Sequence, residues 1–397
     1  MPRALLARRL VLTLLFVELL DELAGGVLGA ALPHVRTDLG LTYAQVGALF
    51  AVPAVLGNLI EVPFGVLADR GHRRQLVVVG GSAFAAALAA MAGAQTYAVL
   101  LGAFVVYYPA SGAFVSVSQA IVVDTDPDRG EALMARWTLA GSVGVVAGPT
   151  LYATVLALGG SWRVALLLVV LCFLAGVVVV ARLPISETVV PAGEVPPGWR
   201  EVASALGRRA VLSALVLLDL ADLLGDVLGA FLALYLVDVA GLEEGAAALA
   251  LAVWAGAGLV GDAVAVPVLD RVDGRLVVRV SAGAATLLYA AMLVVHPAPA
   301  KIALLALLGL CTAGWYPVLL ARYYATMPGR TGVAVSASSV AGMVSGVVPL
   351  TLGLVAEQVG LGVTMWLLLA GPVVLVTALR PRGAARPSRP PCAPAGR

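Results

Sequence analysis

Six carboxylate side chains at two matching positions are the residues of this sequence best placed to do chemistry. Each group lies in an otherwise apolar stretch, and its spacing puts its members on one side of a helix. The groups are Glu18, Asp21 and Glu22, and, about 200 residues later, Asp219, Asp222 and Asp226. Glu61 and Asp262 lie in apolar stretches of their own. An ionised carboxylate in hydrocarbon costs at least about 2.5–3.5 kcal/mol, so we expect all of these acids to serve a function.

These acids have no positive partner at the same depth, because no Lys, Arg or His lies in the middle of the apolar stretches that carry them. Protonation, a bound cation, or an alternation between the two could relieve their mutual repulsion. Alternation would let protons and a cationic substrate compete for the same carboxylates. Polar contact between helices is the structural alternative. Candidate cavity-lining side chains, which could equally pack between helices, are Asn58, Tyr107, Tyr108, Trp315 and Tyr316.

The composition is that of an integral membrane protein. Of the 397 residues, 61% are hydrophobic and 12% are charged, and the mean hydropathy is +1.00. A soluble domain carries about 25% charged residues, so this chain has too little polar surface to face water on all sides. We expect the lipid bilayer around it and no nucleic-acid partner. Cys172, Cys311 and Cys392 lack the spacing of metal ligands, and we expect neither a metal nor a cofactor.

Apolar segments of about 20 residues, the length that crosses a bilayer, recur along the chain. We place six near 10–32, 43–68, 75–95, 97–123, 133–158 and 162–183. Six more lie near 210–237, 246–269, 276–296, 300–325, 332–357 and 360–380. A solvated linker at 184–209 separates the two sets, and we expect the tail at 381–397 to be disordered in the cytoplasm. The expected fold is an all-α membrane protein with two pseudo-symmetric six-helix bundles, at 1–183 and 210–380.

The positive charges predict the orientation of these spans. With the N-terminus in the cytoplasm, 22 of the 25 Lys and Arg residues fall on the cytoplasmic side. The three exceptions are Arg36, Arg163 and Lys301. Positive residues concentrate in the cytoplasmic loops of membrane proteins, so the tally predicts twelve spans with both termini in the cytoplasm. The membrane would be an inner or plasma membrane.

The two halves of the chain repeat one another in parallel order. Tyr107-Tyr108-Pro109 in the first half matches Trp315-Tyr316-Pro317 in the second. Parallel repeats of this kind are one plan of membrane transporters, with the substrate site between the halves near the middle of the membrane.

The loop after the second span carries a more specific motif. It reads Gly65, then Asp69-Arg70, then Arg73-Arg74. This motif resembles the signature of the major facilitator superfamily. The fifth span contains Gly141-x2-Gly144-x3-Gly148-Pro149, which is similar to a motif of the antiporters in that family, its drug and metabolite exporters. The drug exporters usually have an Arg in the fourth span, and this chain has none there.

The resemblance implies two sets of roles. In this family, spans 1, 4, 7 and 10 line a central cavity, so the two acid groups would face each other across it. The loop motif would lock the cytoplasmic ends together in the outward-open state, with Asp69 and Arg70 as a latch. The gating residues would be Gly65, Asp69, Arg70, Arg73 and Asp124, with Asp124 as the partner of Arg70 or Arg73.

We therefore predict a secondary transporter, not an enzyme, that exports a cationic or amphipathic small molecule against an inward flow of protons. The eight acids would bind protons or substrate, and we expect a monomer. Alternatives within transport are a divalent metal cation, or a neutral or anionic metabolite moved with protons. A non-transporting receptor or a membrane enzyme is the alternative of another class, but His34, His72 and His296 form no catalytic cluster in the sequence.

Overall fold

The computed structural model describes residues 3–126, 129–183, 185, 198–328 and 330–379. The side chains of residues 3–7, 58, 61–66, 69, 130–131, 331–332 and 335 also lie outside the description. The predicted tail at 381–397 is therefore outside the described residues. So are the side chains of Asn58, Glu61 and Asp69 and the burial of Gly65, four residues that the sequence analysis singled out.

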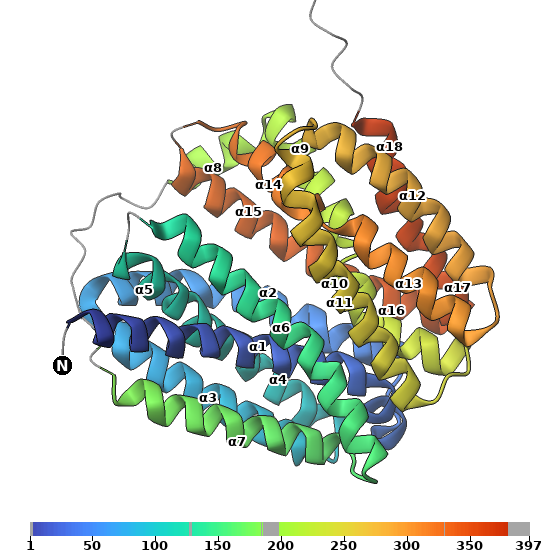
Figure 1. The fold of residues 1–397 in the computed structure, drawn as a ribbon, viewed down its shortest axis with the longest axis horizontal. Helices are drawn as coiled ribbons and strands as arrows, with labels where there is room; N and C mark the ends of the chain where they lie inside the picture. The colour runs from blue at the N-terminus through green and yellow to red at the C-terminus, as the bar shows by residue number, and fades with distance from the viewer. Residues whose placement is uncertain (1–2, 127–128, 184, 186–197, 329, 380–397) are drawn as a thin grey trace, which may run out of the picture.

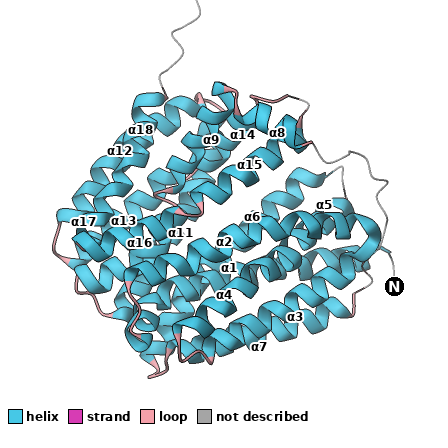
Figure 2. Ribbon diagram, turned by 180° about the vertical axis from the view of Figure 1, so that it is seen from behind, coloured by secondary structure: helices cyan, strands magenta, loops and turns pink. Residues whose placement is uncertain are grey.

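The described chain consists of helices and loops, without strands in these ranges (Figure 2). The first half contains α1 (Arg3–Leu39), α2 (Tyr43–Leu67) with η1 (Ala68–His72), α3 (Arg73–Ala92), α4 (Tyr97–Ser111) with η2 (Gly112–Ser116) and α5 (Val117–Thr125), α6 (Gly130–Ala157), and α7 (Trp162–Ala181). The second half contains α9 (Arg209–Asp222) with α10 (Asp226–Leu234) and η4 (Tyr235–Val239), α11 (Glu244–Leu269), α12 (Gly274–Val294), α13 (Ala298–Thr312) with α14 (Trp315–Tyr324), α15 (Thr331–Ser345) with α16 (Val348–Val359), and α17 (Leu361–Thr364) with η5 (Met365–Leu369) and α18 (Ala370–Ala378). The predicted all-α fold of two six-helix bundles is confirmed.

Most of these segments have the length and composition of membrane spans. Within the described residues, 9 helices are long and apolar enough to cross a membrane, and Tyr43–Gly57 of α2 is a shorter apolar helix. The two remaining segments, α1 and α9 to η4, are those that carry the two acid groups.

Among the described residues, three of the predicted spans are interrupted. The seventh breaks between Asp222 and Asp226, the tenth breaks at Ala313 and Gly314, and the eleventh breaks between Ser345 and Val348. Gly314 has a φ of 76°, a backbone conformation that favours glycine. Pro317 then falls in the first turn of α14, where the missing N–H of proline costs no helical hydrogen bond.

Close packing of α1 against α6 organises the first half. A Cβ atom on Gly144 would lie 2.4 Å from the carbonyl oxygen of Leu19, and one on Gly148 would lie 2.6 Å from that of Leu23. Small residues allow membrane helices to approach this closely. The glycine motif of the fifth span therefore serves the contact between α1 and α6.

The two halves lie face to face (Figure 1) and are joined by polar contacts at one end, which we call the closed end. There Arg36 Nη1 lies 3.0 Å from Asp238 Oδ2, and the Tyr43 hydroxyl donates to the same oxygen at 2.9 Å. The backbone N–H of Tyr43 also donates to Glu357 of α16. Each of these contacts links a residue of the first half to one of the second.

The opposite end, which we call the arginine-rich end, carries Arg73, Arg129, Arg182, Arg209 and Arg271. Figure 1 shows the ribbons of the two halves diverging toward this end. The structure therefore holds the halves together at the closed end and separates them at the arginine-rich end.

Part of the segment that the sequence analysis treats as a solvated linker is helical. α8 (Trp199–Leu206) buries Val202 and Ala205, and Ala205 joins an apolar cluster with Val211 and Tyr323. Two apolar residues three positions apart lie on one face of a helix, which is why this short segment docks on the second half.

Candidate functional site

A central cavity of about 570 Å³ lies between the two halves. Its walls come from α1, α2, α4 and α6 of the first half and from α10 and α11 of the second. Three of the predicted acids, Asp21, Glu22 and Asp226, line it. Among the described residues that line this cavity, none is Lys, Arg or His. The cavity is therefore negatively charged when its carboxylates are ionised.

The acids of α1 reach the cavity because two glycines lie beside them on the same face. Gly25 and Gly29 follow Asp21 by four and eight residues and also line the cavity. The Ser111 hydroxyl of α4 donates to Asp21 Oδ1 at 2.9 Å, which orients that carboxylate. Glu22 lies within electrostatic range of Asp226 from the other half. The two acid groups thus meet across the cavity through these two side chains.

Asp222 lies in an adjoining cavity of about 390 Å³. Gly225, Asp226 and Trp254 border both cavities, so the break between α9 and α10 forms the wall between them. Asp222 Oδ1 lies 3.5 Å from the backbone nitrogen of Asp226. Asp222 and Asp226, two carboxylates of the second group, therefore both line this adjoining cavity.

Glu18 does not line either cavity. Its side chain is 9% exposed, and its carboxylate receives a hydrogen bond from Trp137 of α6. A Cβ atom on Gly141 would lie 2.7 Å from Glu18 Oε1, so the carboxylate fills the space that this glycine leaves. The structure thus gives Glu18 the alternative role that we considered from the sequence, a polar contact between helices.

Asp219 and Asp262 also contact neighbouring helices. Asp219 of α9 is hydrogen-bonded to Ser345 of α15. Asp262 Oδ1 accepts the backbone N–H of Gly314 at 3.0 Å, at the beginning of α14. A carboxylate at the beginning of a helix compensates the partial positive charge of the free N–H groups. Within the described residues, no group of three or more His, Cys, Asp and Glu could hold a metal ion.

Aromatic side chains cover much of the remaining cavity wall. Tyr107 and Tyr108, which the sequence analysis proposed, line it with ring centroids 5.7 Å apart. Phe50 and Trp254 also line it, and sequence reasoning missed both. Both residues lie about 10–15 Å from the first residue of their helices, at a rise of about 1.5 Å per residue. An aromatic residue at this depth in an apolar span is the only sequence signal that could have indicated them.

The two other aromatic candidates behave differently from each other. Tyr316 is 60% exposed and borders the cavity that contains Asp222. Trp315 borders the same cavity but is only 2% exposed, and its ring N–H donates to Ser281 of α12 at 2.8 Å. Trp315 therefore packs within the second half.

One of the predicted gating contacts is present at the arginine-rich end. Arg73 Nη1 lies 2.5 Å from Asp124 Oδ2, and Arg73 is 6% exposed. Asp124 thus pairs with Arg73, one of the two partners expected, while Arg70 is exposed. The pair joins the loop motif to α5 within the first half. Because the side chain of Asp69 lies outside the description, its latch role stays a prediction.

A second set of ionisable residues lies at the closed end. His34 Nδ1 is 2.9 Å from Glu244 Oε2, which joins α1 to α11. Asp38 pairs with Arg163 inside the first half, and this hydrogen bond lowers the pKa of the Asp38 carboxyl below its usual value. Lys301 is buried and donates to the Tyr235 hydroxyl at 3.0 Å. Three basic residues do not fall on the cytoplasmic side in the count of positive charges, and all three lie toward this end: Arg36, Arg163 and Lys301.

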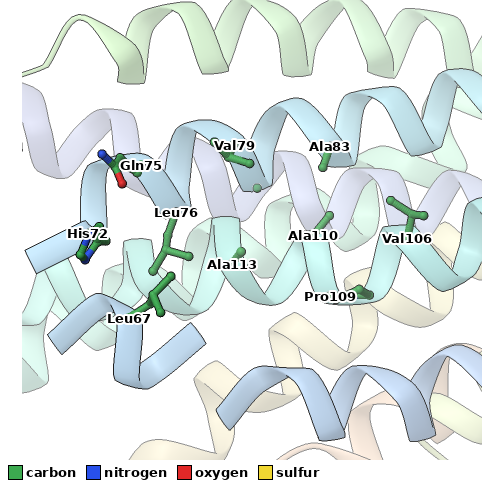
Figure 3. A pocket seen from close by; sticks show the side chains of 11 residues that line it. Leu67, His72, Gln75, Leu76, Val79, Ala83, Val106, Pro109, Ala110 and Ala113 are labelled. Carbon is green, nitrogen blue, oxygen red and sulfur yellow. The ribbon is translucent and has the colours of Figure 1, made fainter. Parts of the chain in front are cut away.

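An apolar groove of about 360 Å³ lies apart from both cavities. Figure 3 shows Val79, Ala83 and Val106 along it, with His72 and Gln75 at one end. None of the predicted acids lines it, so it is not part of the site described above.

Comparison with known proteins identifies relatives over most of the chain. The family model of the Major Facilitator Superfamily matches residues 14–350. A chloramphenicol resistance protein from Streptomyces lividans is 30% identical over 251 residues, and the match spans 62% of this chain and 62% of that relative.

Solved structures share the fold. A bacterial homologue of the human lysosomal transporter Spinster, in an inward-facing and unoccupied conformation, gives a TM-score of 0.76 at 16% identity and covers 94% of this chain and 96% of its own. The nucleoside transporter NupG gives a TM-score of 0.73 at 14% identity and covers 93% of this chain and 98% of its own. At these identities the likeness is one of fold.

Proposed function

Because the chain belongs to the major facilitator superfamily and is a multi-pass membrane transporter, we propose that it exports a cationic or amphipathic small molecule in exchange for protons. The observation that carries this proposal is that Glu22 and Asp226 approach one cavity from opposite halves. Family membership supports transport, and the acids support the cationic substrate and the protons.

Competition for these carboxylates would couple the two movements. When the two halves rock against each other, the separation of Glu22 and Asp226 changes, and their repulsion changes with it. A proton or a cation bound at these acids relieves the repulsion and therefore allows the two halves to approach each other. When the site is empty and ionised, the repulsion opposes this approach. Asp21, oriented by Ser111, adds a third carboxylate to the same site.

The direction of transport rests on the proposed orientation. With both termini in the cytoplasm of an inner or plasma membrane, the arginine-rich end is cytoplasmic and the present conformation diverges toward the cytoplasm. The printed sequence supports this orientation through its charge distribution. The name of the chloramphenicol resistance relative supports export from the cell.

The cavity wall suits an aromatic or amphipathic cation. Phe50, Tyr108 and Trp254 offer ring faces that attract a positive charge and also cover an apolar body. A neutral amphipathic substrate is a second candidate, because the named relative confers resistance to chloramphenicol.

Purified protein in liposomes that contain a pH-sensitive dye tests the proposal. We expect added tetraphenylphosphonium, an aromatic cation, to drive a pH change that is lost in Glu22→Gln and Asp226→Asn. Glu201→Gln in the exposed part of α8 is the matched control and should retain the response. Chloramphenicol in parallel vesicles tests the second candidate. Full responses to tetraphenylphosphonium in both cavity variants would contradict the proposal.

A further inference from the structure

We propose that the protein binds an anionic phospholipid in a separate cavity at its arginine-rich end. This cavity has a volume of about 710 Å³ and lies between the beginning of α1, the end of α5 and the beginning of α6. These helix ends lie on the same side of the molecule in Figure 1. The cavity shares no residue with the central one, and the inference does not depend on the proposed substrate or on proton coupling.

Three arginines give the cavity its charge. Arg8 comes from α1, Arg129 directly precedes α6, and Arg136 lies two turns into α6. All three side chains are exposed, and Asp126 is the one carboxylate among the described residues that line the cavity. Guanidinium groups bind phosphate oxygens through several planar N–H donors, so three of them around one opening favour a phosphate group.

Four apolar side chains also line the same cavity. Val11, Leu12 and Leu15 of α1 and Leu133 of α6 line it together with the arginines. One turn further along α1, Phe16 is 43% exposed, and Leu12 itself is 56% exposed. The apolar surface therefore continues out of the cavity and along α1. A free phosphate ion would leave this surface uncovered, whereas the acyl chain of a lipid would cover it.

The depth of the cavity agrees with a lipid headgroup. At a rise of about 1.5 Å per residue, the 37 residues of α1 are about 55 Å long, well beyond a hydrocarbon core of about 30 Å. The beginning of α1 therefore extends into the headgroup region, with Arg8 at the level of lipid phosphates and Phe16 about 12 Å deeper, at the level of the acyl chains. Basic pockets between membrane helices at this level bind anionic headgroups.

Native mass spectrometry of the full chain in detergent tests the inference directly. We expect phosphatidylglycerol to bind at least fivefold more tightly than phosphatidylcholine. The double variant Arg129→Gln/Arg136→Gln should lower phosphatidylglycerol binding to the level of phosphatidylcholine. Arg182→Gln, an exposed arginine at the same end outside the cavity, is the matched control and should keep the preference. Leu12→Gln, which leaves every arginine in place, should weaken phosphatidylglycerol binding through the acyl contact.

Three results would overturn the inference. Equal binding of the two lipids by the wild-type protein would show that the arginines select no anionic headgroup. Equal losses in Arg182→Gln and the double variant would show a general charge effect. Displacement of the bound lipid by inorganic phosphate at equal concentration would show a phosphate site in which the acyl chain plays no part. Gel filtration confirms folding of each variant, and Arg136→Gln alone replaces the double variant if that does not purify.

Discussion

Glu22 of α1 and Asp226 of α10 line the same central cavity from opposite halves of the molecule, and Asp226 lies within electrostatic range of Glu22. Their separation must change whenever the halves rock against each other. The energy of the conformational change therefore depends on whether these carboxylates are ionised, protonated or paired with a cation. This dependence is the physical basis of the coupling proposed above.

Removing the ion pair at the closed end should shift the conformational equilibrium. Arg36 and Asp238 are partly exposed, and such pairs contribute about 0.2–1 kcal/mol, so we expect Arg36→Gln to change the population ratio by a factor of about 1.5–5. Spin labels on exposed Leu158 of the first half and Val363 of the second would report this as a larger share of long distances.

Arg163→Gln is the matched control for that experiment. It breaks a pair between Arg163 and Asp38 that lies entirely within the first half. We expect its distance distribution to resemble that of the wild type. An equal shift in both variants would show that the contact between the halves has no special role in holding this conformation.

The pair of Asp38 and Arg163 should make stability depend on pH in a defined direction. The hydrogen bond from Arg163 lowers the pKa of Asp38, so its stabilising effect is present above the ordinary Asp pKa of about 3.9 and is lost as pH falls through the lower native value. Asp38→Asn should therefore lower the melting temperature at pH 7, and the difference from the wild type should shrink below about pH 4. A difference in melting temperature that stays constant from pH 7 to pH 3 would show that ionisation of Asp38 is not the cause of the stabilisation.

A methyl group at Gly144 should destabilise the contact between α1 and α6. Its Cβ atom would lie 2.4 Å from the carbonyl oxygen of Leu19, so one backbone must move, at a cost of about 1–3 kcal/mol. Gly102→Ala in α4 adds the same atom where no neighbour lies within 4 Å. Thermal unfolding should show a lower melting temperature for Gly144→Ala only, and equal effects would contradict the packing role.

Glu18→Gln should separate stability from transport. Glu18 is buried against α6 beside Trp137 and does not line the central cavity, so its neutral variant should change the melting temperature. Substrate-driven proton movement per folded molecule should stay within about twofold of the wild type, since a twofold change is only about 0.4 kcal/mol. A loss as complete as that of Asp226→Asn, measured in the same liposomes, would place Glu18 in the coupling site.

The sequence predicted the helices because they follow from local pattern. The expectation that the acids face one cavity came from the resemblance to a family whose spans 1, 4, 7 and 10 line it, and three of the six acids, Asp21, Glu22 and Asp226, line the central cavity. The apolar length of each segment marks a span, and the spacing from Asp21 to Gly29 puts acids and glycines on one face. The repeat of Tyr107-Tyr108-Pro109 indicated two halves with a site between them. These features need no knowledge of which residues touch.

Sequence reasoning could not separate the acids that line a cavity from those that contact a neighbouring helix, because this difference depends on which residues the neighbouring helix presents. Glu18 is one helical turn from Glu22, yet the glycine at position 141 of α6 accommodates it between helices. Asp262 lies within a continuous apolar helix, and only the break at Gly314 supplies the N–H that it accepts. The break of the seventh segment at Gly225 was equally hidden, since a single glycine in an apolar span is common.

Proton release on substrate binding tests the central claim most directly. Detergent-purified protein in weakly buffered solution, mixed with tetraphenylphosphonium, should release protons from the carboxylates that the cation occupies. The release should fall in Asp226→Asn and Glu22→Gln and remain in Glu201→Gln. Binding of the cation without any release of protons would contradict the account.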